Sequence, residues 1–258
     1  MTVTIARQMI GAELLKLRRN RALLAFALLL GVATIALYFG FAAVEHASNP
    51  ARYGPAGGAP HFERSVRIGG LFFGALAAIL IGAEAGTADI SSGVFRDLVA
   101  TGRSRLALFA VRAPGAILLT LAVNGLGFVV GLACSFLLAG SLPTPGVGIV
   151  LESAGWIALS SAVIGMLAVG VGSASGSRAV TLTAVIGLET VATQLLVQAT
   201  ALGQARDALP NVALGQLNPF SSPYDNLTLS AALAVLVLLG WILVSAAIGA
   251  WRTAVRDA

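Results

Sequence analysis

The sequence GAEAGTADISSGVFRDLVATGRSRLALFAVRAP, residues 82–114, interrupts a chain that is otherwise strongly apolar. Basic and acidic side chains are interleaved along it: Glu84, Asp89, Arg96, Asp97, Arg103, Arg105 and Arg112. The segments directly before and after it are long apolar runs. The charges of this stretch therefore help to decide how the chain is oriented, and they make it the best candidate for contact with another protein.

The composition excludes an ordinary soluble domain. The 258 residues are 57% hydrophobic and 10% charged, and the mean hydropathy is +0.91, whereas a soluble domain carries about 25% charged residues. So much apolar surface needs lipid as its solvent. The net charge of +5 is then a matter of where the basic residues lie relative to the apolar runs, and it does not indicate a nucleic-acid partner.

Six apolar segments are long enough, or nearly so, to cross a bilayer, which takes about 20 residues. They are residues 22–44, 68–86, 115–139, 148–172, 179–202 and 231–251. Residues 45–67 contain three prolines, a composition that predicts a loop with a short helix near Phe62. The sequence thus predicts an all-α integral membrane protein with six transmembrane helices in a single domain, residues 1–258.

Residues 1–21, before the first apolar segment, predict an amphipathic helix. Ala6, Ile10, Leu14 and Leu17 recur at spacings of three and four, so they share one side of a helix. The basic residues fall mostly elsewhere around it. A basic helix of this kind lies in the headgroup layer and leads into the first span. The alternative is a plain positively charged flank that only sets the orientation of that span.

An even number of spans puts both termini on one side of the membrane, and the positive-inside rule identifies that side. The basic residues on the terminal side are Arg7, Lys16, Arg18, Arg19, Arg21, Arg96, Arg103, Arg105, Arg112, Arg178, Arg252 and Arg256. Those on the other side are Arg52, Arg64, Arg67 and Arg206. We therefore expect both termini and residues 87–112 in the cytoplasm, and residues 203–230 as an extracellular hairpin.

Two spans carry polar side chains where lipid would not tolerate them. The third span has a stripe of small and polar residues at helical spacing: Thr120, Asn124, Gly127, Gly131 and Ser135. Such a stripe is typical of a close contact between helices, with Asn124 hydrogen-bonded across it. The alternative is that it lines a substrate path.

Glu189 is an acidic residue near the middle of the fifth span, and a carboxylate there should face protein or water. Thr193, Gln194 and Gln198 make the same span polar on one side. The residues predicted to line a translocation path are Glu189, Thr193, Gln194, Gln198 and Asn124. The competing interpretation is a structural set of hydrogen bonds between helices. A proton-coupled site is disfavoured, because no second carboxylate or histidine is well placed to relay a proton.

Several chemistries find no support in the sequence. Lys16 is the single lysine and follows Leu15, so a G-x-x-x-x-G-K-[ST] phosphate loop cannot form. His46 and His61 lie in one loop without metal-ligand spacing, and no serine sits in a G-x-S-x-G motif. We expect no catalytic residue, no metal site and no cofactor on this chain.

At residues 82–114 the chain resembles the membrane subunits, or permeases, of ABC-2 type ABC exporters. After the second span these permeases carry an acid, then Gly-Thr, then a short helix that ends in a turn with arginines. Here Asp89 stands in the acid's place, Gly93-Val94 stands where the family has Gly-Thr, and residues 98–105 match the helix end and turn. Arg112 stands where lysine is common. Val94 departs from the family pattern.

The resemblance extends over the rest of the chain. Residues 13–19, ELLKLRR, are similar to the family's N-terminal interface helix, and residues 217–220, LNPF, are similar to the end of its outside hairpin. The residues implied for the interface helix are Glu13, Leu14, Lys16, Leu17 and Arg18. Those implied for coupling to the ATPase are Asp89, Gly93, Phe95, Arg96, Asp97, Leu98, Gly102, Arg103 and Arg105.

What the resemblance implies is a bacterial plasma-membrane exporter built from two permease subunits, identical or different, and two copies of a separate cytosolic ATPase that binds ATP and Mg²⁺. Phe95 and Leu98 are three residues apart and share a helix face, so they are expected to fill a groove of that ATPase. The alternative is a solvated loop whose arginines only set the topology. The short loops favour a hydrophobic or amphipathic small molecule as substrate, such as a drug, an antibiotic or a lipid.

A second class of function stays open, in which the chain is a membrane protein that uses no ATP. It would then be a secondary carrier or a structural or regulatory membrane partner. Secondary carriers more often show broken helices, ionisable groups at the midplane and internal repeats. This sequence has one acid near a midplane and no clear repeat, which favours the exporter.

Overall fold

The computed structural model describes residues 3–221, 224, 227 and 229–256, and within them every regular element is a helix. The α-helices are α1 (Val3–Arg19), α2 (Arg21–Leu28), α3 (Thr34–Ser48), α4 (Gly58–Arg67), α5 (Phe73–Ser91), α6 (Val94–Ala100), α7 (Arg105–Leu137), α8 (Val147–Ser175), α9 (Arg178–Ile186), α10 (Thr193–Gln198), α11 (Pro210–Gln216) and α12 (Ala231–Val255). Three π-helical segments, η1 (Leu29–Ala33), η2 (Ile68–Phe72) and η3 (Gly187–Ala192), and a 3-10 segment, η4 (Thr200–Ala208), complete the described elements.

The described residues contain six helices that are long and apolar enough to cross a membrane, which confirms the predicted number. They are Arg21–Ser48, Gly58–Ser91, Arg105–Leu137, Val147–Ser175, Arg178–Gln198 and Ala231–Val255. The fold is therefore that of a multi-pass membrane protein. Its predicted single domain, residues 1–258, includes residues 1–2 and 257–258, which lie outside the described part of the chain.

Two helices extend beyond the predicted spans. The short helix expected near Phe62 is present as α4, and it runs through η2 into α5, so the second span begins before the predicted residue 68. Residues 105–112 belong to α7 and residues 87–91 to α5, so the connecting segment is shorter than the predicted 87–112. Hydropathy marks only the lipid-facing part of a helix. The 33-residue α7 is about 50 Å long at about 1.5 Å per residue, which exceeds the ~30 Å hydrocarbon core.

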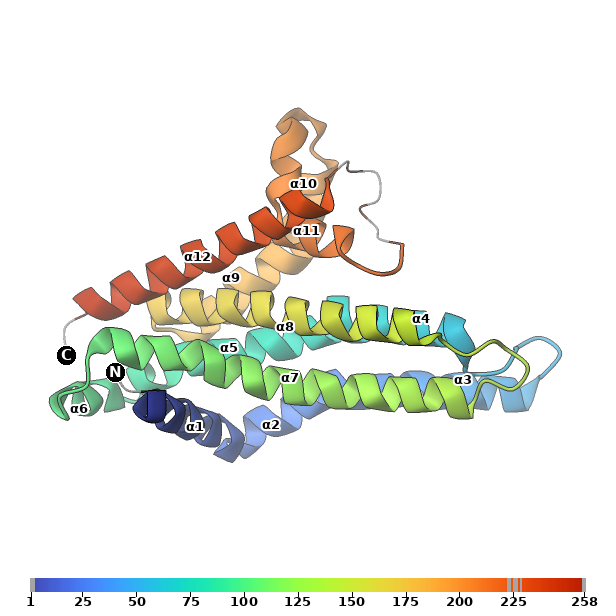
Figure 1. Cartoon of the computed structure of the whole chain (residues 1–258), viewed down its shortest axis with the longest axis horizontal. Coiled ribbons are helices and arrows are strands. Elements are labelled where there is room, and N and C mark those ends of the chain that lie inside the picture. Colours follow the sequence, from blue (N-terminus) through green and yellow to red (C-terminus); the bar gives the residue numbers. More distant parts are fainter. Residues whose placement is uncertain (1–2, 222–223, 225–226, 228, 257–258) are drawn as a thin grey trace.

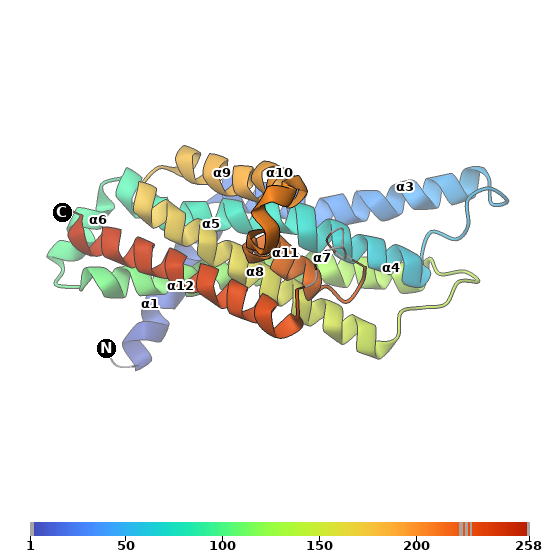
Figure 2. The same cartoon turned by 90° about the horizontal axis from the view of Figure 1, so that it is seen from above.

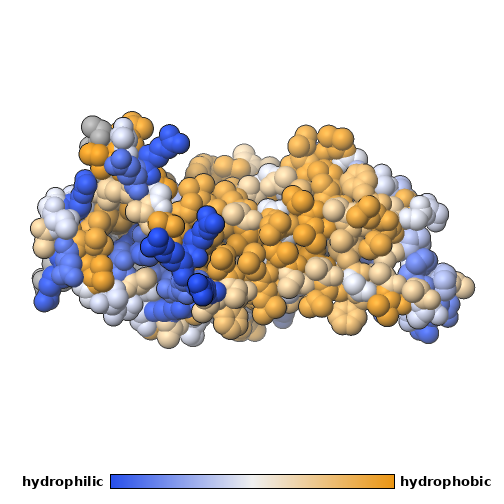
Figure 3. Space-filling model, turned by 90° about the horizontal axis from the view of Figure 1, so that it is seen from below, coloured by the Kyte–Doolittle hydropathy of each residue, from blue (hydrophilic) through white to orange (hydrophobic). Residues whose placement is uncertain are grey.

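Both termini and α6 lie at one end of the elongated molecule, and the connection between α3 and α4 lies at the other (Figures 1 and 2). An apolar band covers the middle, with hydrophilic residues gathered towards the two ends (Figure 3). The span that contains α8 is the centre of the bundle, because 72% of its most apolar window is buried, against 17% for the span that contains α12. α5 and α7 flank it.

Small residues let the helices approach closely. The residues of the third-span stripe are all buried in α7. A Cβ on Gly127 would overlap the carbonyl oxygen of Gly31, and a Cβ on Gly70 would overlap the ring of Trp156. Asn124 Nδ2 donates to the Gly74 carbonyl oxygen at 3.2 Å and to Ser161 Oγ at 2.9 Å, so it joins the second, third and fourth spans.

Replacing Asn124 with leucine is expected to lower the free energy of unfolding by about 0.6–1.7 kcal/mol, between the average and the maximum measured for hydrogen bonds between membrane helices. Leucine keeps the volume but leaves both acceptors without this donor. Reversible unfolding of the purified protein in mixed micelles measures the change. Thr120→Val is the matched control, because the Thr120 hydroxyl donates only within its own helix, to the Ala116 carbonyl oxygen. A loss no larger than that of the control would contradict the role.

Within residues 1–21, where an interface helix was predicted, residues 3–19 form the helix α1, and Asn20 follows it. Asn20 begins the next helix, because its side-chain oxygen accepts a hydrogen bond from the Leu23 amide at 3.1 Å. The side of α1 that contains Glu13 and Leu17 is buried, mainly against α7 and the core around it. α1 is thus attached to the bundle rather than separate from it.

The connection between the last two spans is more than a surface hairpin. Within the predicted hairpin, residues 203–230, positions 222–223, 225–226 and 228 lie outside the described residues. Residues 210–215 of α11 are buried in the main core. Trp156 Nε1 donates to the Leu214 carbonyl oxygen and Trp241 Nε1 donates to that of Ala208, each at 2.8 Å. These bonds hold the connection against α8 and α12.

Candidate functional site

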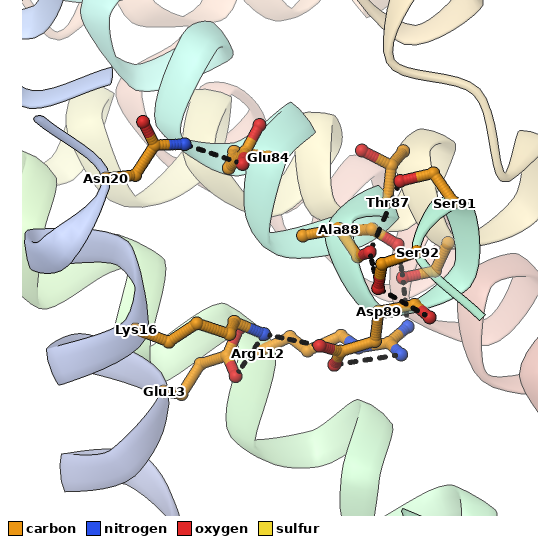
Figure 4. Close-up of polar contacts among 12 residues, drawn as sticks. Glu13, Lys16, Asn20, Glu84, Thr87, Ala88, Asp89, Ser91, Ser92 and Arg112 are labelled. Carbon is orange, nitrogen blue, oxygen red and sulfur yellow. Dashed lines mark hydrogen bonds and ion pairs between the residues drawn. The ribbon is translucent and has the colours of Figure 1, made fainter. Parts of the chain in front are cut away.

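Four charged side chains from three helices meet at the end of the molecule that carries the termini (Figure 4). This charge cluster consists of Glu13 and Lys16 on α1, Asp89 on α5 and Arg112 on α7. Lys16 Nζ lies 2.7 Å from Glu13 Oε2 and 3.0 Å from Asp89 Oδ1. Arg112 Nη2 lies 3.7 Å from Asp89 Oδ2. The cluster is formally neutral, and Asp89 is shared between its two cations.

Arg112 is the most deeply placed member, with its side chain 1% exposed. Its Nη1 donates to Ser173 Oγ on α8 at 3.2 Å, and its guanidinium lies over the ring of Phe95 at 5.6 Å from the centroid. A buried charge is tolerated only when it is paired and enclosed. Arg112 therefore connects α5, α6, α7 and α8 at a single point.

Glu13 attaches α1 to this point. Burial raises the pKa of the Glu13 carboxyl above its usual range, and the neighbouring Lys16 ammonium works in the opposite direction. A Cβ on Gly115 of α7 would meet the Glu13 side chain at 2.8 Å. The glycine thus lets α1 approach α7 closely enough for the cluster to form. Leu17 is buried, Leu14 is half-buried and Arg18 is exposed.

The short helix α6 is framed by Gly93 and Gly102, whose φ angles are +76° and +81°. Glycine is the residue that adopts this left-handed conformation without strain. Both glycines allow the chain to turn sharply, so α6 is a separate short helix between α5 and α7 (Figure 1).

The expectation that Phe95 fills a groove of a partner is wrong. Phe95 is 4% exposed, because its ring covers the buried guanidinium of Arg112. Leu98 is half-buried. The exposed residues of α6 and the following turn, among those predicted to couple, are Arg96, Asp97, Gly102 and Arg103. Phe95 holds α6 to the bundle, and the charged side chains face outward.

A cleft of about 320 Å³ lies between α1, α6 and α7. Its lining residues are Met9, Ala12, Glu13, Lys16, Asp89, Val94, Leu98, Thr101, Arg103, Leu108 and Val111. Residues from the predicted interface helix and from the predicted coupling segment therefore share one surface. Arg105 is placed differently, since its Nη1 donates to the carbonyl oxygens of Ala254 and Arg256 at the end of α12, at 3.0 and 2.7 Å.

A second polar contact on α5 joins the second span to the first residue of the fifth span and to Asn20, which directly precedes the first span. Glu84 Oε1 accepts from Asn20 Nδ2 at 2.9 Å, and Glu84 Oε2 lies 2.9 Å from Arg178 Nη1. The sequence showed Glu84 only as a charge near the end of the second span. Neither partner could be inferred locally, because both come from other helices.

Glu189 lies in the π-helical segment η3 and is 5% exposed. Its side chain lines a cavity of about 210 Å³. The other lining residues are Leu71, Phe72, Ala75, Leu76, Ile79, Thr190, Gln194, Asn211 and Tyr224. Neither carboxylate oxygen of Glu189 has a hydrogen-bond partner among the described residues.

Of the predicted path residues, the structure brings Glu189 and Gln194 together at this cavity. Thr193 is fully buried and donates to the Leu188 carbonyl oxygen. Gln198 is exposed, and Asn124 is bonded between helices, away from the lining.

Thr190, Asn211 and Tyr224 complete the polar lining of the cavity. Thr190 is indicated by the sequence, because it lies on one helix side with Gln194 and Gln198 at a spacing of four. Asn211 and Tyr224 come from the connection before the last span, where no local pattern indicates them.

The two histidines bond to their own neighbourhood. His61 Nδ1 lies 2.7 Å from the Tyr38 hydroxyl, and His46 Nδ1 lies 2.8 Å from the Tyr53 carbonyl oxygen. Within the described part of the chain, no group of three or more histidine, cysteine or acidic residues is arranged to hold a metal ion.

The sequence matches no family model, and a search of curated proteins finds none similar to it. The features of the chain that bear on function are therefore the six spans, the charge cluster and the exposed charges of the helix α6.

Proposed function

We propose that this chain is the membrane-spanning subunit of an ATP-driven exporter in a bacterial plasma membrane, coupled to a separate cytosolic ATPase. One observation carries the proposal. The helix α6 exposes charged side chains, yet Phe95 fixes it to the cluster where α1, α5, α7 and α8 meet. A protein that moves α6 would therefore act on four helices at once.

The coupling would work through the long helices. Closure of the ATPase would displace α6 and, through Phe95 and Arg112, shift α7 relative to α5. Lys16 would transmit the same displacement to α1 through its ion pair with Asp89. Packed helices of this kind switch between discrete arrangements rather than deform continuously, which suits a transporter that opens alternately to the two sides.

The orientation belongs to the same proposal. α6 and both termini lie at one end of the molecule. Most of the basic residues were assigned to this terminal side of the membrane, and such an excess favours the cytoplasm. α1 would then lie along the cytoplasmic headgroup layer. The spans that contain α2, α9 and α12 are poorly buried, at 28%, 22% and 17% of their windows. Their apolar faces would contact lipid and a second permease subunit.

The ATP and Mg²⁺ of such a complex would be bound by the ATPase, and the substrate would be a small hydrophobic or amphipathic molecule. The cavity beside Glu189, at about 210 Å³, suits a molecule of that size better than a polymer.

The variant Arg96→Glu/Arg103→Glu is expected to abolish association with the ATPase, because it reverses two exposed positive charges at the proposed docking surface. The measurement is ATP hydrolysis, per mole of this chain, in material affinity-purified from native membranes. We expect the double variant to lose at least about 90% of that activity, since a tenfold loss of bound partner needs only about 1.4 kcal/mol.

Arg52→Glu/Arg64→Glu is the matched control, because it reverses two charges at the opposite end of the molecule. Equal ATP hydrolysis in the docking variant and the control would overturn the assignment of α6. If the unmodified chain purified without any ATP hydrolysis, a membrane protein that uses no ATP would be the better description.

A further inference from the structure

The Glu189 cavity has a buried end and an accessible rim. Ala75, Ile79 and Glu189 are 7%, 0% and 5% exposed, so this part of the lining is buried. Phe72 is 50% exposed, and Gln194 is also exposed. A molecule can thus enter past Phe72 and Gln194 and reach the carboxyl group of Glu189.

The carboxyl group is not used by the fold. Neither of its oxygens accepts a hydrogen bond, and no described lysine, arginine or histidine forms an ion pair with it. The amide of Asn211, another lining residue, donates through Nδ2 to the Glu189 main-chain oxygen at 2.7 Å rather than to its carboxyl group. An unpaired carboxylate in such a place is strongly disfavoured. It must hold a proton or meet a cation.

The apolar lining of the cavity indicates what the uncharged part of a ligand would be. Most of the lining is apolar, with Leu71, Phe72, Ala75, Leu76 and Ile79 on the side formed by η2 and α5. The volume of about 210 Å³ exceeds the ~150 Å³ of a cavity that holds benzene. One aromatic ring with a compact charged head would fit. An ammonium head near Phe72 or Tyr224 can also use the electron-rich face of an aromatic ring.

We propose that this cavity binds a small lipophilic cation, an aryl-alkyl ammonium, with its charge against Glu189 and its ring against the η2–α5 wall. The assignment names the substrate class of the exporter and in that sense rests on the proposed function. The binding step itself involves only this chain.

The test is equilibrium binding of two probes to the purified full chain in vesicles of phosphatidylglycerol, a lipid without an ammonium group. Benzyltrimethylammonium carries a permanent charge, and neopentylbenzene is its neutral isostere. Saturable binding of the cation is expected, and Glu189→Gln should weaken its affinity about 30-fold or more. This is the smallest loss of affinity typical of a buried charge pair from which one partner is removed. The neutral probe should bind more weakly than the cation and should be little affected by the substitution.

Two further variants locate the site. Glu152→Gln removes an exposed carboxyl group of another span and should leave both probes unaffected. Ala75→Leu keeps Glu189 but fills the apolar end, so it should weaken binding of both probes. Equal affinity of the two probes for the unmodified chain, an unchanged affinity of the cation for Glu189→Gln, or no binding of the cation would each overturn the assignment.

The result is separable from that of the ATPase experiment. If the chain associated with the ATPase but did not bind the cation, only the proposed substrate class would be wrong. Cation binding by a chain that recruits no ATPase would instead leave the site standing and remove the ATP-driven function.

Discussion

Replacement of Arg112 by methionine is expected to lower the free energy of unfolding by about 3–5 kcal/mol, the range for a buried ion pair that loses one member. The substitution keeps an apolar side chain against Phe95 but removes the bond to Ser173 and the pairing with Asp89. Glu13 and Asp89 then share one cation, Lys16, and the cluster carries an uncompensated negative charge. Reversible unfolding of the purified chain in mixed micelles measures the loss.

A double variant tests whether the uncompensated charge causes the loss of stability. Arg112→Met/Asp89→Asn leaves the pair of Lys16 with Glu13 and restores neutrality, so it should recover at least about 1 kcal/mol through coupling between neighbouring sites. Arg96→Met, at an exposed position of α6, is the control for loss of a guanidinium and should change stability by less than about 0.5 kcal/mol. A double variant that is less stable than Arg112→Met would refute the electrostatic account.

Gly127→Val should separate the first and third spans. The Cβ would overlap the backbone carbonyl of Gly31, and backbone cannot move aside as a flexible side chain can. Overpacking in a core typically costs about 1–3 kcal/mol, and we expect the upper end here because the whole helix must shift. The measurable result is a loss of folded monomer in fluorescence-detected size exclusion, together with reduced stability in mixed micelles.

Gly125→Val is the control in the same helix. Nothing lies within 4 Å of a Cβ built at Gly125, so the variant shares the change in helix propensity without the collision. If both variants lost stability equally, the effect would come from propensity, and the close contact of Gly127 with Gly31 would be unimportant.

The features that could be predicted from the sequence are those that depend on a local pattern. Lipid imposes a long apolar run on each span, so the number of spans followed directly from hydropathy. The polar ends of helices carry no such signal, so hydropathy did not show that the second span continues back through residues 58–67 or that the third begins at residue 105. The helices continue through these residues because their charged side chains contact water or bond to other helices, as Arg105 and Arg112 do.

The contacts within the charge cluster could not be predicted from the sequence. Asp89 and Lys16 were each selected, but their contact joins residues 73 positions apart and depends on how three helices pack. The sequence predicts Phe95 as an exposed anchor because it shows the apolar face of α6, whereas the contact between Phe95 and Arg112 depends on packing. Glu189 was noticed as an acid within an apolar run, whereas Asn211 and Tyr224, which complete its cavity, lie on a connection that folds back into the bundle.

The central position of α8 has a consequence for biosynthesis. α8 packs against α5 and α7, which precede it in the chain, and against α12, which follows it after another span. Gly170 of α8 has no side chain, and the backbone of Ser245 occupies the space where a Cβ would stand. While the ribosome is still translating the connection after the fifth span, α12 is not yet present to fill the space beside Gly170. The bundle can close only when the final span has entered the membrane, so a chain that terminates early leaves its centre open to lipid and to quality-control proteases.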